Sequence, residues 1–242
     1  MLNISKLPKR PLTDLSKTAL KTIVHENVSN TQLDYLKENC IAVDENDRVI
    51  GDTSKAECHK KETATLHRAF SVFIFNPNRE LLLQQRASTK ITFPNRWTNA
   101  CCSHPLFTPE EIESNNVFGI RRAARRKLEH ELGISQNYCR LEDYEFVGKF
   151  LYEADSDKEW KEHELDYVLI LKNFTGNMIV NSDEVSATKY IDQKNLDSVI
   201  FSTPEQFSPW FRMLHEKGWI AKWWKDLDNL SKYSSDNIVR LN

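Results

Sequence analysis

The order of its apparent elements predicts that this sequence folds as a layered α/β or α+β domain. Short β-rich stretches come first, a strongly helical stretch follows, and further strands precede a helical tail. With 40% hydrophobic and 28% charged residues, the 242-residue chain has the composition of a globular protein with one substantial core. We therefore expect one domain over residues 31–242, preceded by an arm over residues 1–30.

The N-terminal region is expected to change from flexible to folded near residue 31. Residues 1–30 combine two prolines, many Ser and Thr residues and an excess of basic side chains, which is typical of a flexible arm. A short helix over residues 31–39 and a strand over residues 41–43 should follow. The polar turn at residues 44–47 leads to a β-rich stretch at residues 48–50, which predicts a hairpin.

The remaining elements follow from turn residues and periodicity. Residues 69–75 and 80–85 flank Asn76-Pro77-Asn78, which predicts a second hairpin. Residues 117–132 form the strongest helical pattern, with Gly133 placed to end it. Strands are expected around residues 144–152, 164–171 and 187–191. Ser208-Pro209 predicts the start of a Trp-rich helical tail, with the serine as its cap.

The net charge limits the classes of binding partner, and the cysteine content indicates the cellular compartment. A net charge near −2 gives no field that would attract nucleic acid or an anionic membrane, and the apolar runs are too short for a membrane span. An odd number of cysteines with no C-x-x-C motif favours a reducing compartment. The last two residues are no peroxisomal signal, so we expect a cytoplasmic protein with a small-molecule partner, while the basic arm leaves an organelle open. The sequence does not indicate an oligomeric state.

A sparse set of metal-capable residues accompanies two adjacent cysteines. Glu162 and Glu164 are two apart in an apparent strand, so both carboxylates should lie on one face, where burial requires a cation or proton between them. Alone, this pair fits a solvated strand end, and a single histidine is usually an ordinary surface or core residue. Together with His59, His67 and His104, the pair predicts a five-ligand site for one divalent ion, with zinc, manganese and magnesium all admissible.

The adjacent cysteines should face opposite ways. Cys101 and Cys102 alternate faces if the chain is extended, so only one can point at a ligand, and the other should be a small buried apolar residue. Cationic or metal neighbours are expected to lower the pKa of the inward thiol. Such a thiol could act as an acid or base, or as a nucleophile.

The helix over residues 117–132 resembles the carboxylate helix of the Nudix hydrolases, which cleave diphosphates. In the register R-E-U-x-E-E-x-G-U, with U aliphatic, Lys127 and His130 replace two metal-binding glutamates and Glu131 alone remains. An ammonium group at a metal position removes the ion cluster that activates water for hydrolysis. The helix therefore predicts a scaffold that holds a diphosphate without cleaving it, and Lys55, Arg86, Lys90 and Lys127 could supply the cations.

The stretches LHRAFSVFIF, LLLQQRASTKITFPNRWTNACCSHP, ELGI and WKEHELDY together resemble the eukaryotic form of type I isopentenyl-diphosphate isomerases, over roughly residues 33–232. The resemblance implies a Nudix-like α/β/α layered domain with a mixed sheet. It also implies an isomerase of isoprenoid biosynthesis that interconverts isopentenyl and dimethylallyl diphosphate through a tertiary carbocation.

Site residues carry over from this resemblance position by position. The metal ligands would be His59, His67, His104, Glu162 and Glu164, and Glu131 would help hold a magnesium ion on the substrate diphosphate. Cys102 matches the catalytic cysteine, Glu164 the catalytic acid and Tyr152 its phenolic helper. Trp210 is expected to present its ring to the cation, although packing is the default role for such an aromatic residue. Substrate-binding positions are matched by Lys55, Arg86, Lys90, Ser103 and Lys127, the last standing where the family usually has arginine.

Two other functions compete with this hypothesis. One is a Nudix-type diphosphate hydrolase, which Lys127 and His130 argue against. The other is a non-catalytic metal-binding module, which the combination of thiol, glutamates and histidines disfavours.

Overall fold

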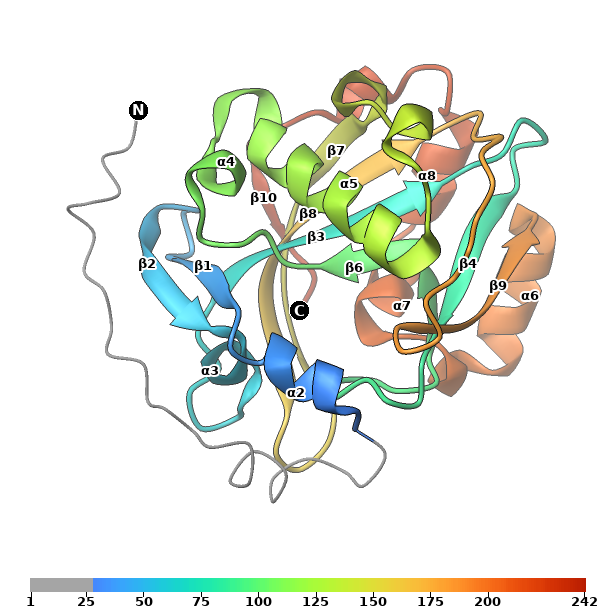
Figure 1. The fold of residues 1–242 in the computed structure, drawn as a ribbon. Helices are drawn as coiled ribbons and strands as arrows, with labels where there is room; N and C mark the ends of the chain where they lie inside the picture. Colours follow the sequence, from blue (N-terminus) through green and yellow to red (C-terminus); the bar gives the residue numbers. More distant parts are fainter. Residues whose placement is uncertain (1–27) are drawn as a thin grey trace.

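The computed structural model describes residues 28–242, and the predicted arm falls almost wholly on residues 1–27, outside the described residues. Within residues 28–242 there are two β-sheets (Figure 1). The larger has seven strands, in the order β10 (Ile238–Arg240), β7 (Glu145–Asp155), β8 (Lys161–Leu171), β3 (His67–Ile74), β1 (Asn39–Val43) and β2 (Val49–Ser54), with β6 (Cys101–Ser103) also paired to β3. The smaller has three, in the order β5 (Trp97–Asn99), β4 (Leu81–Arg86) and β9 (Val185–Ile191).

The larger sheet is mixed, as expected. Strand β3 runs parallel to β8, and β10 runs parallel to β7, whereas β7 and β8 are antiparallel. Antiparallel neighbours can be joined by short turns, but the parallel pair β3/β8 requires a long connection. Here that connection contains the helix α5 (Phe118–Leu132). The prediction of a layered α/β domain with a mixed sheet is confirmed.

Helices cover both faces of the larger sheet (Figure 1). Their bounds are α2 (Asn30–Tyr35), α3 (Lys55–His59), α4 (Pro109–Ile112), α5 (Phe118–Leu132), α6 (Gln193–Ser202), α7 (Pro209–Glu216) and α8 (Trp219–Lys225). Apolar residues of α5 share one core cluster with Phe70 and Val72 of β3. Phe73, the next residue along β3, belongs to a second cluster with α7 and α8. Since successive strand residues point to opposite faces, β3 supplies both layers of the core.

The helix over residues 117–132 is α5, and it ends as predicted. Gly133 has φ = 62° and its N–H bonds to the carbonyl of Glu129, while Ile134 N–H bonds to Leu128 O. A glycine in this left-handed conformation allows the last helical carbonyls to find partners. The C-terminal end of α5 is therefore determined locally.

The predicted second hairpin is wrong in its pairing. The turn exists, with Arg79 N–H bonded to Asn76 O and an isolated bridge between Phe75 and Leu81. Beyond that bridge β3 pairs with β8, β1 and β6, whereas β4 pairs with β5 and β9 in the other sheet. A turn signal predicts a change of direction but not the partner, because cross-strand partners are chosen by long-range packing.

Two further local predictions need correction. The first helix ends at Tyr35 rather than residue 39, because the carbonyls of Leu36 and Glu38 accept bonds from Ala56 and Lys55 at the start of α3. Ser208 occupies the position before α7 but does not cap it. Its hydroxyl instead donates to Thr98 Oγ1 at 2.9 Å. Helix α6 and strand β10 were not predicted.

Candidate active site

The three predicted histidine ligands and two glutamates come together at one end of β3. His59 is the last residue of α3, a helix that begins with a capping box formed by Ser54 and Glu57. His67 begins β3 and lies directly opposite Glu164 of β8. One ligand atom from each of His59, His67, His104 and Glu164 lies within 4.8 Å of the others. His59 was expected in a polar connection, but the structure places it in a short buried helix.

Hydrogen bonds outside the cluster orient two of the rings. His59 Nδ1 is 2.7 Å from Lys55 O, and His67 Nδ1 is 2.8 Å from Thr65 O. A carbonyl can only accept, so each Nδ1 carries a proton, and in the neutral ring each Nε2 presents a lone pair. His59 Nε2 lies 2.8 Å from Glu162 Oε2, yet that oxygen has no hydrogen-bond partner, and buried His67 Nε2 has none either. His104 Nε2 is 2.7 Å from Glu164 Oε1, so one pair in the cluster is bonded while His67 Nε2 and Glu162 Oε2 are not. Buried ligand atoms that converge and lack partners fit a metal ion between them.

The electrostatics of the cluster keep its central carboxylate ionised. Burial raises the pKa of Glu164, but the facing rings of His67 and His59 outweigh this effect, so the pKa falls to about 2. Burial lowers the pKa of His104, and the neighbouring His59 and His67 lower it further. Despite burial, Glu162 raises the pKa of His59, so a bound cation would replace the ring proton there. Imidazole nitrogens around an anionic carboxylate are the donor set that a divalent cation requires. The buried His/Glu group can therefore hold a metal ion.

Glu164 also accepts a hydrogen bond from the phenol predicted to assist it. Tyr152 of β7 lies opposite Glu164 across the β7/β8 ladder, and its hydroxyl donates to Glu164 Oε2 at 2.5 Å. Burial, followed by the charge on Glu164, raises the pKa of Tyr152 well above its ordinary value. The phenol therefore retains its proton beside an ionised carboxylate.

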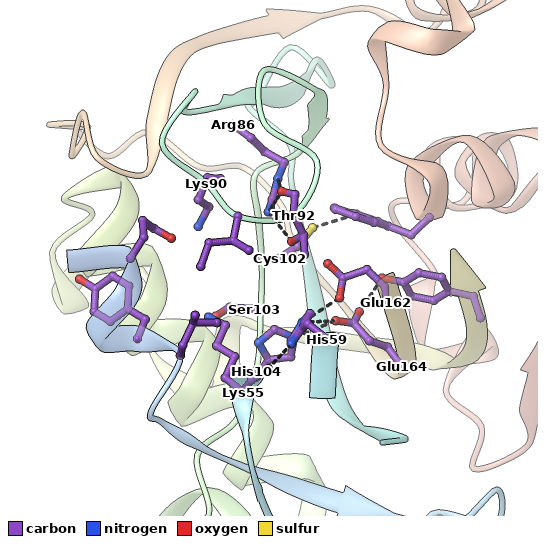
Figure 2. Close-up of a pocket in the computed structure, with 16 residues that line it drawn as sticks. Lys55, His59, Arg86, Lys90, Thr92, Cys102, Ser103, His104, Glu162 and Glu164 are labelled. Atoms are coloured by element: carbon purple, nitrogen blue, oxygen red, sulfur yellow. Dashed lines mark hydrogen bonds and ion pairs between the residues drawn. The ribbon is translucent and has the colours of Figure 1, made fainter. Parts of the chain in front are cut away.

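The adjacent cysteines face opposite sides of the sheet, as predicted. Cys101 is fully buried in the cluster under α5, and its thiol donates to Glu131 Oε2 at 3.6 Å. Cys102 lines the pocket (Figure 2), and its sulfur is 3.0 Å from Asn99 Oδ1 and 3.0 Å from Trp210 Nε1. Strand alternation therefore decides which thiol meets a ligand.

The expected lowering of the thiol pKa is wrong for this structure. Burial raises the pKa of Cys102 to about 12, and the carboxylate of Asp166 adds to the effect. Hydrogen bonds from Ser71 and Thr98 and the more distant charge of Arg86 lower the pKa, but by less. The sequence indicated cations near the thiol. It could not show that burial and the charge of Asp166 affect the pKa of Cys102 more strongly than those cations do.

Strand register places the thiol and the carboxylate on one face of the larger sheet. Cys102 lies opposite Ser71 of β3, and Glu164 lies opposite His67. His67 and Ser71 are four residues apart on one strand, so they share a face, and directly paired residues lie on the same side. Strands β6 and β8 flank β3 on its two edges. Cys102 and Glu164 therefore approach the same space from opposite edges of β3.

Cationic side chains line one part of the pocket, its cationic end, where Figure 2 labels Lys55, Arg86 and Lys90. Trp210 and Tyr152 line another part, its aromatic end. Of the predicted substrate-binding residues, Lys55, Arg86, Lys90 and Ser103 line the pocket. Trp210 also lines it, with its ring edge-on to Phe93 and the Arg86 guanidinium 5.5 Å from the ring centre. Sequence reasoning missed five lining residues, because they come from α2, from the residue after it and from a loop without any motif: Gln32, Tyr35, Leu36, Ile91 and Thr92.

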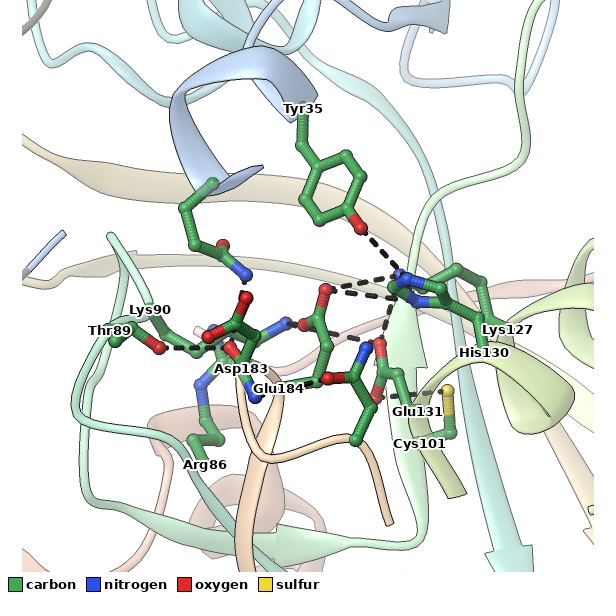
Figure 3. A network of polar contacts seen from close by, with 12 residues as sticks. Tyr35, Arg86, Thr89, Lys90, Cys101, Lys127, His130, Glu131, Asp183 and Glu184 are labelled. Carbon is green, nitrogen blue, oxygen red and sulfur yellow. Dashed lines mark hydrogen bonds and ion pairs between the residues drawn. The ribbon is translucent and has the colours of Figure 1, made fainter. Parts of the chain in front are cut away.

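Lys127 and Glu131 lie outside this lining, in an adjoining network of buried charges (Figure 3). Lys127 Nζ is 3.2 Å from Glu131 Oε1 and 3.9 Å from Glu184 Oε1, and Lys90 Nζ also contacts Glu184. His130 Nε2 is 2.8 Å from the hydroxyl of Tyr35. Glu184 was not predicted, because it follows a loop with no periodic pattern. The expected contacts of Lys127 and Glu131 with substrate remain predictions.

Comparisons with known proteins agree with this architecture. A NUDIX domain model matches residues 65–211. The chain is 44% identical over 216 residues to the isopentenyl-diphosphate delta-isomerase of Gibberella zeae, covering 86% of this chain and 85% of that protein. It is 40% identical over 233 residues to the chloroplastic isopentenyl-diphosphate delta-isomerase I of Arabidopsis thaliana, covering 90% and 79%.

A solved structure from Deinococcus radiodurans has a TM-score of 0.50 and 17% identity over 68% of this chain and 90% of that one, which shows a common fold. In the part of the chain that the structure describes, no helix has the length and apolar character needed to cross a membrane. The fold, the family model and the extent of identity agree with the resemblance noted in the sequence. The chain belongs to the isopentenyl-diphosphate delta-isomerase family of NUDIX proteins.

Proposed function

We propose that this protein interconverts isopentenyl diphosphate and dimethylallyl diphosphate, moving one C=C bond without net redox change. The observation that carries the proposal is the placement of Cys102 and the Glu164–Tyr152 pair in one pocket, on strands at opposite edges of β3. An allylic proton shift needs a donor at one carbon and an acceptor at another. Two such groups with a cationic subsite beside them match that requirement.

Proton transfer is assigned to these side chains. The reaction starts from the form in which one proton has moved from the Cys102 thiol to the Glu164 carboxylate. Glu164, assisted by Tyr152, then delivers this proton to the terminal methylene, and the π electrons form the new C–H bond. The tertiary carbocation then loses a proton from the neighbouring CH₂ to Cys102, and the C–H electrons become the new double bond. A thiol whose pKa is raised to about 12 gives a strongly basic thiolate, which favours removal of that proton. The reverse reaction uses the same groups in exchanged roles.

The buried His/Glu group is proposed to hold one divalent ion through His59, His67, His104, Glu162 and Glu164. The unpartnered His67 Nε2 and Glu162 Oε2 support this assignment, and zinc, manganese and magnesium all suit the donor set. When bound, the ion supplies positive charge that orients Glu164 and adjusts its acidity.

The diphosphate is assigned to the cationic end of the pocket. Lys55, Arg86, Lys90 and Ser103 line that end and present donors for phosphate oxygens. A magnesium ion carried by the diphosphate would meet Glu131, and Lys127 would add charge from the adjoining network. Binding of this non-reacting group holds the alkene between the acid and the base.

The aromatic end of the pocket is proposed to protect the carbocation. Trp210 and Tyr152 are both almost fully buried and exclude water that would otherwise trap the cation as an alcohol. Attraction between a cation and an aromatic face contributes about 2 kcal/mol when desolvated. Because a typical enzymatic effect is about 8 kcal/mol or more, most of the rate enhancement must come from the positioned acid and base.

A Nudix-type hydrolase is the alternative function. Hydrolysis requires several carboxylates around a metal that activates water. In α5 the Lys127 ammonium group and His130 occupy two of those positions, and Lys127 is held there by Glu131 and Glu184. An ammonium group and an imidazole in place of two carboxylates disfavour hydrolysis.

The proposed location is the cytoplasm. A related protein carries a chloroplastic designation, so an organellar form is the alternative. Fluorescence microscopy of the full chain carrying a C-terminal tag would distinguish the two.

The function is tested by incubating the purified protein with isopentenyl diphosphate in heavy water and following the products by NMR. Dimethylallyl diphosphate should form with deuterium in its allylic positions, and a chelator should abolish its formation. A parallel incubation with nucleoside diphosphate derivatives should release no phosphate. Phosphate release without isomerisation would replace the proposal with the hydrolase.

The two cysteines provide a matched pair of variants. Cys102→Ala should lose turnover by a factor of at least ~10³ while substrate still binds, because the proton acceptor is lost. Cys101→Ala should retain most activity and lose only stability, since its thiol packs under α5. Steady-state kinetics and calorimetric binding measure both quantities, and an active Cys102→Ala protein would contradict the assignment.

A further inference from the structure

Asn99 is a fully buried amide beside the active-site thiol, although it does not line the pocket. It is the last residue of β5, and its Nδ2 donates to two backbone carbonyls, Val72 O at 3.1 Å and Cys101 O at 2.9 Å. Carbonyl oxygens can only accept hydrogen bonds, so these two contacts determine which end of the amide is the NH₂ group. The carbonyl end, Oδ1, must therefore face the other way.

Asn99 Oδ1 faces the functional groups of the aromatic end. It accepts from Cys102 Sγ at 3.0 Å, from Trp210 Nε1 at 3.2 Å and from Thr98 Oγ1 at 2.9 Å. The indole N–H is shared, because it also lies 3.0 Å from Cys102 Sγ. One anchored oxygen thus contacts both the thiol and the ring that line the pocket.

These contacts limit the directions from which a ligand can approach the Cys102 sulfur. The S–H bond points to Asn99 Oδ1, and the Trp210 N–H approaches one lone pair of the sulfur. Ser71 Oγ, at 3.5 Å, borders the sulfur on the β3 side. Because Cys102 also lines the pocket, a remaining lone pair is left to face a ligand.

We propose that Asn99 is a positioning residue, which orients the Cys102 thiol and the Trp210 indole for proton transfer. The proposal rests on the function proposed above. When Cys102, as a thiolate, takes a proton from the substrate, a C–H bond breaks, its electrons form the double bond, and the S–H bond forms again. The new S–H hydrogen needs an acceptor in a site without water, and Asn99 Oδ1 supplies it.

This role should affect turnover more than substrate binding. The hydrogen bonds of Asn99 reach Cys102 and Trp210 but none of the cationic residues that are assigned to the diphosphate. Asn99→Leu keeps the branching of the side chain and removes every hydrogen bond. Asn99→Asp keeps an acceptor oxygen and the shape. We expect kcat to fall by about 100-fold in the first variant and by about 10-fold in the second, with KM changed by less than about threefold in both.

Asn76→Leu is the matched control for lost stability. Asn76 lies in the turn between β3 and β4, where Nδ2 donates to Glu80 Oε2 at 2.7 Å and Oδ1 accepts from Glu80 N at 2.9 Å. Like Asn99→Leu, this variant loses a side-chain amide that makes hydrogen bonds within the chain, but Asn76 does not line the pocket. Its Tm should fall while kcat stays at the wild-type value.

A second measurement does not depend on isomerase activity. The rate of Cys102 alkylation by iodoacetamide, read from the mass of its peptide at one pH, should change at least fivefold in Asn99→Leu. It should change less than twofold in Asn76→Leu. Asn99→Asp, which preserves the shape and an acceptor, keeps the test valid if the leucine variant does not fold.

The outcomes separate the two proposals. A wild-type protein that does not isomerise the substrate overturns the proposed function, and the alkylation rates then decide the role of Asn99. Unchanged alkylation in both Asn99 variants overturns the positioning role, whatever the activity. So does a loss of kcat that matches the loss in Asn76→Leu at equal Tm.

Discussion

At the scale of single residues, the direction of a side chain decides its chemistry. Cys101 and Cys102 are neighbours in the chain, but one packs under α5 and the other lines the pocket. The same alternation places Glu162 and Glu164 together, whereas His163 bonds to Ala64 O on the other side. The face of the strand on which a residue lies thus decides whether its functional group packs in the core or lines the pocket.

Tyr152→Phe should show how much the phenolic proton contributes. The variant removes the 2.5 Å hydrogen bond to Glu164 and leaves the ring in place. We expect kcat to fall by about 10² with little change in KM, because a proton-transfer group is lost and no diphosphate contact is removed. Tyr167→Phe is the control, since that buried phenol donates to Asp47 outside the pocket. Equal losses of kcat in the two variants would contradict a role for Tyr152 in proton transfer.

Lys127→Met should be strongly destabilising. The side chain is almost fully buried and lies 3.2 Å from Glu131 Oε1, so its removal leaves buried carboxylates undercompensated. Breaking one side of a buried ion pair costs about 3–5 kcal/mol. Lys232→Met, which removes a surface pair with Asp226, should not measurably change stability. Urea unfolding measures both, and a stable Lys127→Met protein would show that the network relaxes.

At the scale of elements, short local signals decide where helices begin and end. A capping box starts α3, and Gly133 ends α5. Both matter to the site, because α3 carries His59 at its end and α5 carries Lys127 and Glu131. The signals that determine where these helices begin and end therefore also determine where their charged side chains lie.

Gly133→Ala should cost more stability than Gly218→Ala. Both glycines have positive φ, 62° and 74°, so either alanine is strained by about 1–2 kcal/mol. A Cβ at Gly133 would also lie 2.4 Å from Ile179 O, whereas nothing lies within 4 Å of one at Gly218. The difference between the two variants in urea unfolding measures the steric contribution, and equal losses would show that the loop at Ile179 moves freely.

At the scale of the whole molecule, the site is assembled from distant segments. Ligand atoms come from α3, β3, β8 and the segment after β6, and the pocket is completed by α2 and α7. Helices α5 and α7 lie on opposite faces of the larger sheet (Figure 1). The layers must therefore pack before the ligands can converge, which couples metal binding to folding.

Acid should destabilise the fold through its buried carboxylates. The charges of Lys90 and Lys127 outweigh burial and hold the pKa of Glu184 far below its ordinary value of 4.5. A lowered pKa in the folded state contributes stability above pH 4.5, and this is lost as the pH falls further, by up to about 1.4 kcal/mol per pH unit for each proton. Glu184→Gln should be less stable at pH 7 but should lose less stability between pH 4.5 and 3. Urea unfolding across that range is the measurement, and parallel pH profiles would contradict the assignment.

Much of the fold and the candidate site was predictable from the chain alone, because its signals are local. The period of the helix over residues 117–132, the glycine after it and the spacing of Glu162 and Glu164 each reflect backbone geometry within a few residues. The separation of residues 69–75 and 80–85 into two sheets was not predictable, because strand partners are set by packing between remote segments.

The sequence by itself determined the layered fold, the family, the metal-capable residues and which residue types could transfer protons, since these depend on composition, spacing and motif. Only the tertiary structure decided that Asp166 and burial raise the pKa of Cys102, that Glu184 holds Lys90 and Lys127, and that Asn99 contacts both the thiol and Trp210. The physical reason is that desolvation and charge–charge interactions depend on distances in space. Those distances exist only once remote segments have packed together.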